Sequence, residues 1–328
     1  MLLEDKYFKE LSKAELWQRY CGFLDLSVDE FMKIQKNLLM DQMERISDSI
    51  LAKKIMKNHK PKSVDEFREL VPLTSYEDYE PYLSEKREDV LAIKPRFWSH
   101  SAGRGGSFKW IPHGTEYIEK VIKHTIGIYI LGSCKQKGQL NIAPGLRFLS
   151  ILPPAPYGSG SLFQIVPEYF SIRIYPPTED TQDMDFQERI KMGFQMALKD
   201  GVDVIGTIAS VLVRMGEEFT NQMQNASFSP SMLHPKVLLR LIRAWLRSKK
   251  EGRGILPKDI WPTKGIMASG MDVAIYKDEI ARYWGSLPYE AYGCTEAYFL
   301  AIESWNRKGM IFHPDNVFLE FIPYDEKP

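Results

Sequence analysis

The chain of 328 residues has little cysteine. Its three cysteines (Cys21, Cys134 and Cys294) lie far apart and include no CxxC pair. This excludes a disulfide framework and a cysteine-ligated zinc site, and it is typical of a protein of the reducing cytosol. We therefore expect a cytoplasmic protein.

Charge of one sign and long apolar runs are also lacking. Forty-three basic residues balance forty-three acidic ones, so no overall charge points to nucleic acid. No apolar run approaches the roughly 18 to 20 residues of a membrane span. The first residues are charged from position 4 onward and lack the apolar core of a signal peptide. The histidines show neither HxxxH nor HxH spacing, which makes a histidine metal cluster improbable.

What is present is the composition of a globular protein. Hydrophobic residues make up 44% and charged residues 26% of the chain, enough apolar material to bury a sizeable core. The first sixty residues predict helices. In 28–46, for example, Phe31, Ile34, Leu38 and Met43 fall near one face of a helix. Ser63 and Ser75, each followed by acidic residues, predict two further helix starts.

From about Arg96 onward, short apolar runs alternate with helical stretches. The runs 146–154, 202–209, 264–270, 287–293 and 317–323 are candidate strands, and 187–198, 235–247 and 274–284 are candidate helices. This alternation predicts an α/β fold with mainly parallel sheets flanked by helices. Several strand exits carry Gly, Ser or Thr, namely 153–161, 206–207, 269–270 and 293–296. Ligands bind at such exits in parallel sheets, so we expect a binding crevice there.

Three short motifs are candidates for chemistry. In 97–112 (FWSHSAGRGGSFKWIP), glycines precede Lys109; their N–H groups could surround a phosphate, although the spacing is not that of a P-loop and a flexible turn is the alternative. In 291–299, Thr295 and Glu296 offer a hydroxyl and a carboxylate, a pair suited to magnesium beside a phosphate, or Glu296 merely caps a helix. In 153–163, Tyr157 and Phe163 would line a substrate slot, or the segment is a rigid proline turn.

The segment 235–250 (PKVLLRLIRAWLRSKK) predicts a basic amphipathic helix. Its apolar residues are Val237, Leu238, Leu241, Ile242 and Trp245, and its basic ones include Lys236, Arg240, Arg243 and Arg247. Such a helix could lie on a membrane. We expect instead that its apolar face packs on its own domain.

Taken together and in this order, the motifs resemble the adenylate-forming superfamily. The stretch 63–83 (SVDEFRELVPLTSYEDYEPYL) resembles a segment of the Gretchen Hagen acyl-acid amido synthetases, and 100–112, 268–272 (ASGMD) and 292–297 (YGCTEA) fall where that family has its nucleotide loops. Phenylacetate–CoA ligases share the plan, and APYGSGSLF is closer to their substrate loop. The resemblance implies the large N-terminal domain of such an enzyme, with a helical segment over 1–95 and a nucleotide- and acyl-binding α/β domain over 96–328.

The resemblance also implies a reaction and a set of residues. A carboxylic acid would react with ATP, with Mg²⁺ bound, to give an acyl-adenylate, and an amino acid or CoA would accept the acyl group. Thr295 would contact the α-phosphate, Glu296 would hold the metal, and Lys109 would act with them on the phosphates. The nucleotide would further contact Ser101, Gly103, Arg104, Gly105, Gly106, Ser269, Gly270, Met271, Tyr292 and Gly293. The acid would contact Tyr157, Gly158, Ser159, Gly160 and Thr207.

The chain departs from the family pattern in two ways. Gly103 and Arg104 stand where the family loop has hydroxyl side chains; Arg104 could compensate, because guanidinium binds phosphate in a bidentate manner. The family also continues beyond this point with an aspartate that binds ribose and with a small lid domain. We therefore expect a truncated large domain with little or no turnover of its own. The alternative is a non-catalytic domain that binds a small acid or a protein partner.

Overall fold

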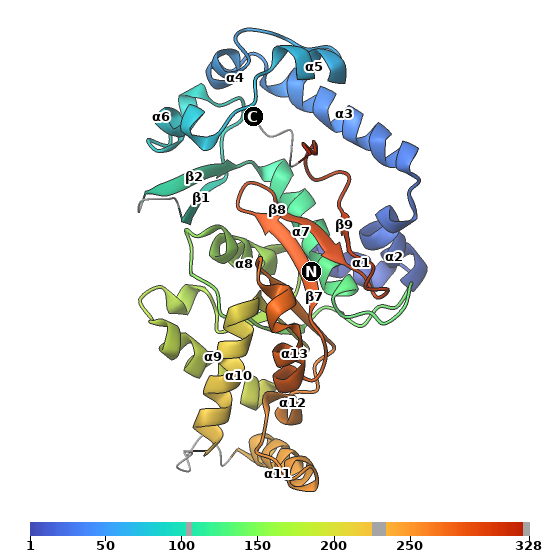
Figure 1. Cartoon of the computed structure of the whole chain (residues 1–328), viewed down its shortest axis with the longest axis vertical. Helices are drawn as coiled ribbons and strands as arrows, with labels where there is room; N and C mark the ends of the chain where they lie inside the picture. The colour runs from blue at the N-terminus through green and yellow to red at the C-terminus, as the bar shows by residue number, and fades with distance from the viewer. Residues whose placement is uncertain (103–106, 225–233, 324–328) are drawn as a thin grey trace.

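The computed structural model describes residues 1–102, 107–224 and 234–323 and shows an elongated molecule with helices at both ends (Figure 1). The N-terminal part is helical. Its helices are α1 (Leu3–Glu10), α2 (Lys13–Cys21), α3 (Val28–Ile46), α4 (Ile50–Ile55), α5 (Val64–Leu70) and α6 (Glu80–Leu83). The first strand begins at Phe97.

Local sequence accounts for where several of these helices begin. Ser27 caps α3: its hydroxyl accepts a hydrogen bond from the backbone N–H of Glu30, whose carboxylate accepts one from the N–H of Ser27. Ser63 caps α5 through the N–H of Glu66 (3.1 Å), which confirms the helix start predicted there. At Ser75 the chain forms a short 3₁₀ turn (Tyr76–Asp78) before α6.

A seven-stranded sheet organises the rest of the chain. The strand order is β4-β3-β5-β6-β7-β8-β9. The pairs among β4, β3, β5, β6 and β7 are parallel, whereas β8 and β9 are antiparallel additions. The strands are β3 (Leu146–Leu149), β4 (Ile172–Tyr175), β5 (Val204–Ile208), β6 (Gly265–Ser269), β7 (Tyr289–Cys294), β8 (Tyr298–Glu303) and β9 (Met310–Phe312). The mainly parallel sheet confirms the predicted fold class.

Helices cover both faces of this sheet. One core gathers side chains of α7 and α8 with those of α2, and the other gathers side chains of α9, α10, α12 and α13. The bounds are α7 (Thr115–Leu131), α8 (Gly158–Tyr169), α9 (Phe186–Asp200), α10 (Ala209–Gln224), α11 (Pro235–Lys250), α12 (Pro257–Ile260) and α13 (Val273–Trp284). Helix α2, before the boundary predicted at residue 95, shares a core with α7, which lies after it. The division of the chain at residue 95 stays a prediction.

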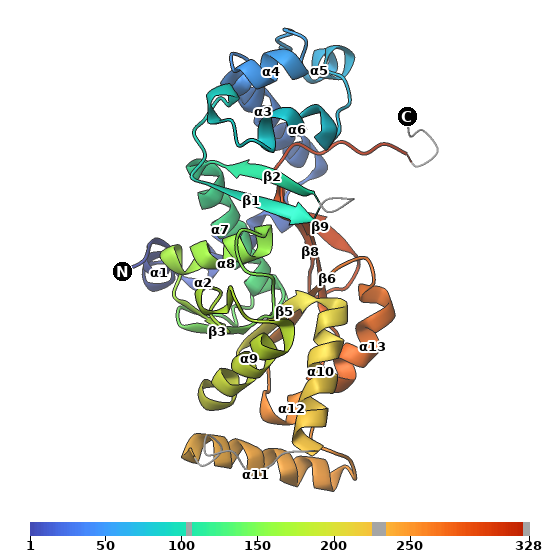
Figure 2. The same ribbon diagram turned by 90° about the vertical axis from the view of Figure 1, so that its left-hand side faces the viewer.

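A separate hairpin, β1 (Phe97–Ala102) with β2 (Phe108–His113), lies between helices α3 to α6 and the sheet (Figure 2). A parallel bridge between His100 and Tyr157 joins the hairpin to the start of α8. The backbone N–H of His100 also donates to the carbonyl of Pro156 (2.8 Å). The hairpin is therefore held beside the segment that follows β3.

The prediction of a strand at 317–323 is wrong. The side chain of Gln35, on α3, takes the backbone groups that a neighbouring strand would use. Its Nε2 donates to the carbonyl of Val317 (2.9 Å), and its Oε1 accepts from the N–H of Leu319 (2.7 Å). Phe318 packs against the small core of α3 to α5. The segment thus makes these hydrogen bonds with a side chain instead of a sheet.

The predicted helix at 235–247 is confirmed as α11, but the packing expected of its apolar face is wrong in part. Val237 and Ala244 are buried, whereas Ile242 and Trp245 remain 54% and 50% exposed. In the part of the chain that the structure describes, no helix is both long and apolar enough to cross a bilayer.

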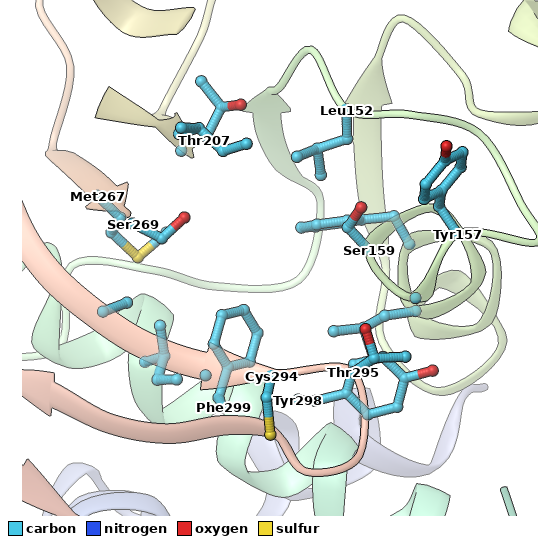
Figure 3. Close-up of a pocket in the computed structure, with 18 of the residues that line it drawn as sticks. Leu152, Tyr157, Ser159, Thr207, Met267, Ser269, Cys294, Thr295, Tyr298 and Phe299 are labelled. Atoms are coloured by element: carbon cyan, nitrogen blue, oxygen red, sulfur yellow. The ribbon is translucent and has the colours of Figure 1, made fainter. Parts of the chain in front are cut away.

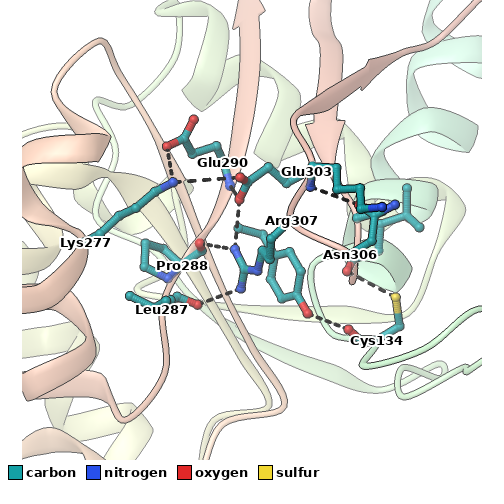
Figure 4. A network of polar contacts seen from close by, with 12 residues as sticks. Cys134, Lys277, Leu287, Pro288, Glu290, Glu303, Asn306 and Arg307 are labelled. Atoms are coloured by element: carbon teal, nitrogen blue, oxygen red, sulfur yellow. Dashed lines mark hydrogen bonds and ion pairs between the residues drawn. The ribbon is translucent and has the colours of Figure 1, made fainter.

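A polar network fastens the outer ends of β7 and β8 (Figure 4). The carboxylate of Glu303 accepts hydrogen bonds from the N–H of Glu290 (3.0 Å) and from the guanidinium of Arg307 (2.8 Å). Arg307 also donates to the carbonyls of Leu287 and Pro288. Lys277, from α13, pairs with Glu290 at 2.7 Å. The network ties the β7–β8 hairpin to its neighbours at the end opposite Thr295.

Candidate active site

A cavity of about 410 Å³ opens at the carboxyl ends of the parallel strands. Residues of β3, β5, β6 and β7, and of the segments just after β3 and β7, meet there with α7, α8 and the β1–β2 hairpin (Figure 3). Of the residues predicted for the site, it is lined by Ser101, Tyr157, Gly158, Ser159, Thr207, Ser269, Gly293 and Thr295. The predicted crevice is therefore present, and it brings together segments that are far apart in sequence.

The inner walls of the cavity are apolar. They are formed by Ile128, Tyr129, Phe148, Leu152, Leu162, Phe163, Met267 and Phe299. Among the described residues, no Asp, Glu, Lys or Arg lines it. Such a surface favours an apolar or aromatic group, because a charged one would be desolvated without a partner. One polar side of the cavity carries Ser159 and Thr295, and Thr207 and Ser269 lie on the opposite side (Figure 3).

The N-terminus of α8 points into this polar side. The helix begins at Gly158, and its first N–H groups have no acceptor within the helix. A β-carbon at Gly158 would lie 2.8 Å from Cγ2 of Thr295, and one at Gly160 would lie 2.3 Å from the backbone of Pro154. Glycine is thus required for the helix start to approach both neighbours closely. A helix N-terminus exposed in this way attracts anions.

Thr295 and Glu296 sit in the turn between β7 and β8. Tyr298, just after the turn, has φ of +48°, a left-handed conformation unusual for a bulky residue. The amide of Asn316 donates to the carbonyls of Ala297 (2.9 Å) and Phe299 (2.7 Å), on either side of Tyr298. These two hydrogen bonds fix the shape of the turn, in which Glu296 is exposed.

Ser101 and Lys109 are opposite each other in the β1–β2 hairpin. Ser101 lines the cavity, whereas Lys109 does not; its Nζ lies 5.1 Å from the centre of the Tyr76 ring. The predicted phosphate-loop residues Gly103, Arg104, Gly105 and Gly106 lie outside the described residues.

Four of the residues predicted to contact the nucleotide differ in their positions. Ser269 lines the cavity, whereas Gly270, Met271 and Tyr292 are exposed and do not line it. Gly270 has φ of +115°, a conformation that favours glycine at this turn.

Thr207 and Gly160, which were predicted to contact the acid, make other contacts in the fold. The hydroxyl of Thr207 already donates to the carbonyl of Ile151 (2.9 Å), so only its lone pairs are available to a ligand. Gly160 does not line the cavity; it lies in the first turn of α8, tightly against the backbone of Pro154.

His100 is a cavity residue to which the sequence analysis gave no role. The residue is 3% exposed, and its ring stacks on Phe108 with ring centres 4.0 Å apart. Burial and then the nearby charge of Lys86 lower its pKa, which keeps the imidazole neutral at pH 7. Its position next to the glycine-rich loop was the available sequence signal.

Cys294 also lines the cavity but is poorly suited to be a nucleophile. Although the residue is exposed, desolvation of its sulfur by the surrounding protein, followed by the charge of Glu296, raises the pKa of its thiol to about 11. The protonated thiol would predominate at neutral pH.

Within the described ranges, no cluster of three or more His, Cys, Asp or Glu residues is arranged to hold a metal ion by itself. Glu296 nevertheless fits Mg²⁺, since that ion is commonly bound by one or two carboxylates together with the phosphates of a substrate.

Comparisons with known proteins agree with this architecture. The model of the GH3 family N-terminal domain matches residues 22–289. The acyl acid amido synthetase AtGH3.15, solved in complex with 2,4-DB, superimposes with a TM-score of 0.66 at 16% identity over 94% of this chain and 61% of that one. A 2-hydroxyisobutyryl-CoA ligase, solved with 2-HIB-AMP and CoA, gives 0.62 at 12% identity over 89% and 56%.

No curated protein matches the chain in sequence comparison. The chain spans about three fifths of the length of the structures to which it is similar, and both of those are ligases. At 16% and 12% identity, these two structures show only that the fold is shared. The family model matches most of the chain, and this match shows the family. This protein therefore belongs to the GH3 family, whose N-terminal domain it contains.

Proposed function

We propose that this chain is the nucleotide- and acyl-binding part of an ATP-dependent ligase that activates a carboxylic acid as an acyl-adenylate. The observation that supports this best is the cavity itself: apolar walls end at the N-terminus of α8, directly against Thr295. An acid with an apolar body would place its carboxylate at this polar end, where a helix N-terminus stabilises negative charge.

In this proposal the polar end also receives the α-phosphate of ATP. The Thr295 hydroxyl and the first N–H groups of α8 would donate to its oxygens, and Glu296 would hold Mg²⁺. When bound, the metal supplies positive charge that offsets the charge developing on the phosphates. Ser269, Tyr292 and Gly293 would contact the nucleoside, and Lys109, with the predicted loop 103–106, the outer phosphates.

The chemistry balances without a covalent enzyme intermediate. A carboxylate oxygen of the acid attacks the α-phosphorus, and the bond to the β-phosphate oxygen breaks, which releases pyrophosphate. An amine or thiol then attacks the acyl carbon, AMP leaves, and the acceptor loses one proton. The role of Thr295, Ser159 and the α8 N-terminus is to hold the carboxylate and phosphate in line and to stabilise charge. Amide and thioester products both remain open.

Calorimetric titration with ATP and Mg²⁺ tests the site. We expect binding by the wild-type chain to weaken roughly tenfold in Thr295→Val and in Glu296→Gln, because each removes a contact to charged phosphate. Cys294→Ser, a near-isosteric change in the cavity wall at the end of β7, should leave affinity unchanged. Pyrophosphate release with a panel of acids, with amino acids or CoA added, would then identify the acceptor. Equal affinity in all variants would refute the site.

A second candidate is a binding domain without chemistry. It is favoured by Gly103 and Arg104, which stand where hydroxyls are expected. Binding of an apolar acid in the absence of ATP, with no ATP binding by the longest natural chain, would support it over the ligase.

A further inference from the structure

Helix α11 lies across the end of the molecule opposite helices α3 to α6 (Figure 2). It packs on α9 and α12. Its inner face buries Val237, Ala244 and Ser248, and the guanidinium of Arg240 donates to the backbone carbonyls of Leu198 and Lys199 at the end of α9. One face of α11 is thus fixed to the domain, which leaves the other face at the surface.

The outer face is apolar along its length. Leu239, Ile242, Trp245 and Leu246 are each about half exposed, between 49% and 55%. Their spacing of three and four residues places them side by side on the helix. Single exposed apolar residues are ordinary on a protein surface, but a contiguous row on one helix marks an interaction site.

The same helix carries only positive charge. The segment 235–250 contains six Lys and Arg residues and neither Asp nor Glu, in a chain whose net charge is zero. Exposed cations flank the apolar row: Lys236, Arg243, Arg247, Lys249 and Lys250. Glu251, the acid that follows the helix, is paired with Arg253 at 2.7 Å. No ion pair among the described residues engages the five flanking cations.

We propose that α11 docks this protein on the surface of an anionic lipid bilayer, with the helix parallel to the membrane plane. The apolar row would enter the boundary between headgroups and acyl chains, and the flanking cations would contact anionic headgroups. Trp245 suits this boundary, because its indole ring has an apolar body and a polar N–H.

Two other occupants fit less well. A second copy of the chain would bring two helices of the same positive charge together, which opposes association. An acidic protein would have to supply a groove shaped to a convex helix, since α11 presents a ridge on an end of the molecule (Figure 2). A bilayer supplies negative charge and an apolar layer over a plane and requires no matching groove.

Vesicle flotation tests this proposal. We expect the full chain to float with vesicles of phosphatidylcholine containing about one third phosphatidylserine, and much less with phosphatidylcholine alone, with binding that weakens as salt increases. Ile242→Ser with Leu246→Ser should reduce the partition coefficient by roughly tenfold per residue. Arg243→Gln with Arg247→Gln should reduce it roughly fivefold per cation.

Ile275→Ser is the matched control, since this residue is 79% exposed but lies on α13. Its binding should equal that of the wild type. All substituted positions are exposed, so circular dichroism and thermal unfolding should be unchanged. The proposal is overturned if the wild type ignores anionic vesicles, or if neither double variant reduces binding. Sedimentation that shows a dimer abolished by Ile242→Ser with Leu246→Ser, without vesicle binding, would assign the face to self-association instead.

Discussion

Gly158 lies directly against Thr295, so close that a β-carbon at position 158 would come within 2.8 Å of Cγ2 of the threonine. This contact joins the start of α8 to the turn between β7 and β8. Threonine is short and branched at Cβ and has little freedom to move aside. The anion-binding end of the helix and the Thr295 hydroxyl are therefore held in one arrangement.

Substitution of this glycine should disturb that arrangement. We expect Gly158→Ala to lower the free energy of unfolding by about 1 to 3 kcal/mol through overpacking, and to weaken binding of ATP. Gly254→Ala is the matched control, because nothing lies within 4 Å of a β-carbon at that glycine. Chemical denaturation and calorimetry measure both effects. Normal nucleotide affinity in Gly158→Ala would show that the contact is unimportant for the site.

Asn316 should be needed for the shape of the Thr295 turn. Asn316→Asp removes both donors that hold the carbonyls of Ala297 and Phe299 and buries a carboxylate. We expect a loss of about 1 to 3 kcal/mol for each carbonyl left without a partner, with reduced ATP affinity as well. Asn37→Asp, on an exposed part of α3, should change neither quantity. If Asn316→Asp retains wild-type stability, the turn holds its own conformation.

The size of the acyl cavity should depend on Phe299, which lines it. Phe299→Ala should shift the preference of the protein towards bulkier acids, and the affinity for small apolar acids should fall. A change of one methylene in such a pocket is worth about 1 to 3 kcal/mol. Competition binding with a series of aliphatic and aromatic acids measures this. Phe321→Ala, a highly exposed position outside the cavity lining, serves as the control. An unchanged order of affinities in Phe299→Ala would mean that the acid binds elsewhere.

Stability should fall in mildly acidic solution because of His113. Burial lowers the pKa of this histidine from 6.5 to about 4, and its Nε2 lies 2.7 Å from the Ser99 hydroxyl. The unfolded chain binds the proton first as pH falls. The contribution of His113 to the free energy of unfolding is therefore fully present above pH 6.5. It is lost progressively as the pH falls to about 4, and the total loss is on the order of 3 kcal/mol.

The variant His113→Phe should remove about one proton from the slope of unfolding free energy against pH in this window. Burial also lowers the pKa of His313, to about 3, so a shallower slope should persist in the variant. Urea denaturation at a series of pH values measures both slopes. Identical slopes in the two proteins would contradict the proposed titration of His113.

Glu303 should matter more than the surface ion pairs. Its side chain is 7% exposed and accepts from Arg307 and from the N–H of Glu290 (Figure 4). Glu303→Ala leaves the N–H of Glu290 without this acceptor and removes the negative charge that faces Arg307, and we expect a loss of about 3 kcal/mol. Asp48→Ala, which breaks exposed pairs with Lys53 and Lys60, should cost less than about 1 kcal/mol. Thermal or urea unfolding measures the loss of stability in both variants. Equal losses would contradict the prediction that the buried carboxylate contributes more than the exposed one.

The sequence by itself determined the features that depend on neighbouring residues. The capping serine at position 63, the alternation of strands and helices after residue 96, and the Thr295–Glu296 turn at a strand exit could all be read from local patterns. The family followed from those motifs in order. Four of the five predicted strands contain a strand of the sheet, because their apolar runs had to be buried between two layers of helices.

Only the tertiary structure decided where distant segments meet. The segment 317–323 is as apolar as a strand, yet Gln35, nearly three hundred residues earlier, takes its backbone hydrogen bonds. The exposed row on α11 could not be distinguished from a buried one, because both have the same helical period. The approach of Gly158 to Thr295 is likewise set by the packing of α8 on the β7–β8 turn. Local composition fixes what a segment can form, but the partner that completes its hydrogen bonds or covers its apolar face depends on the whole fold.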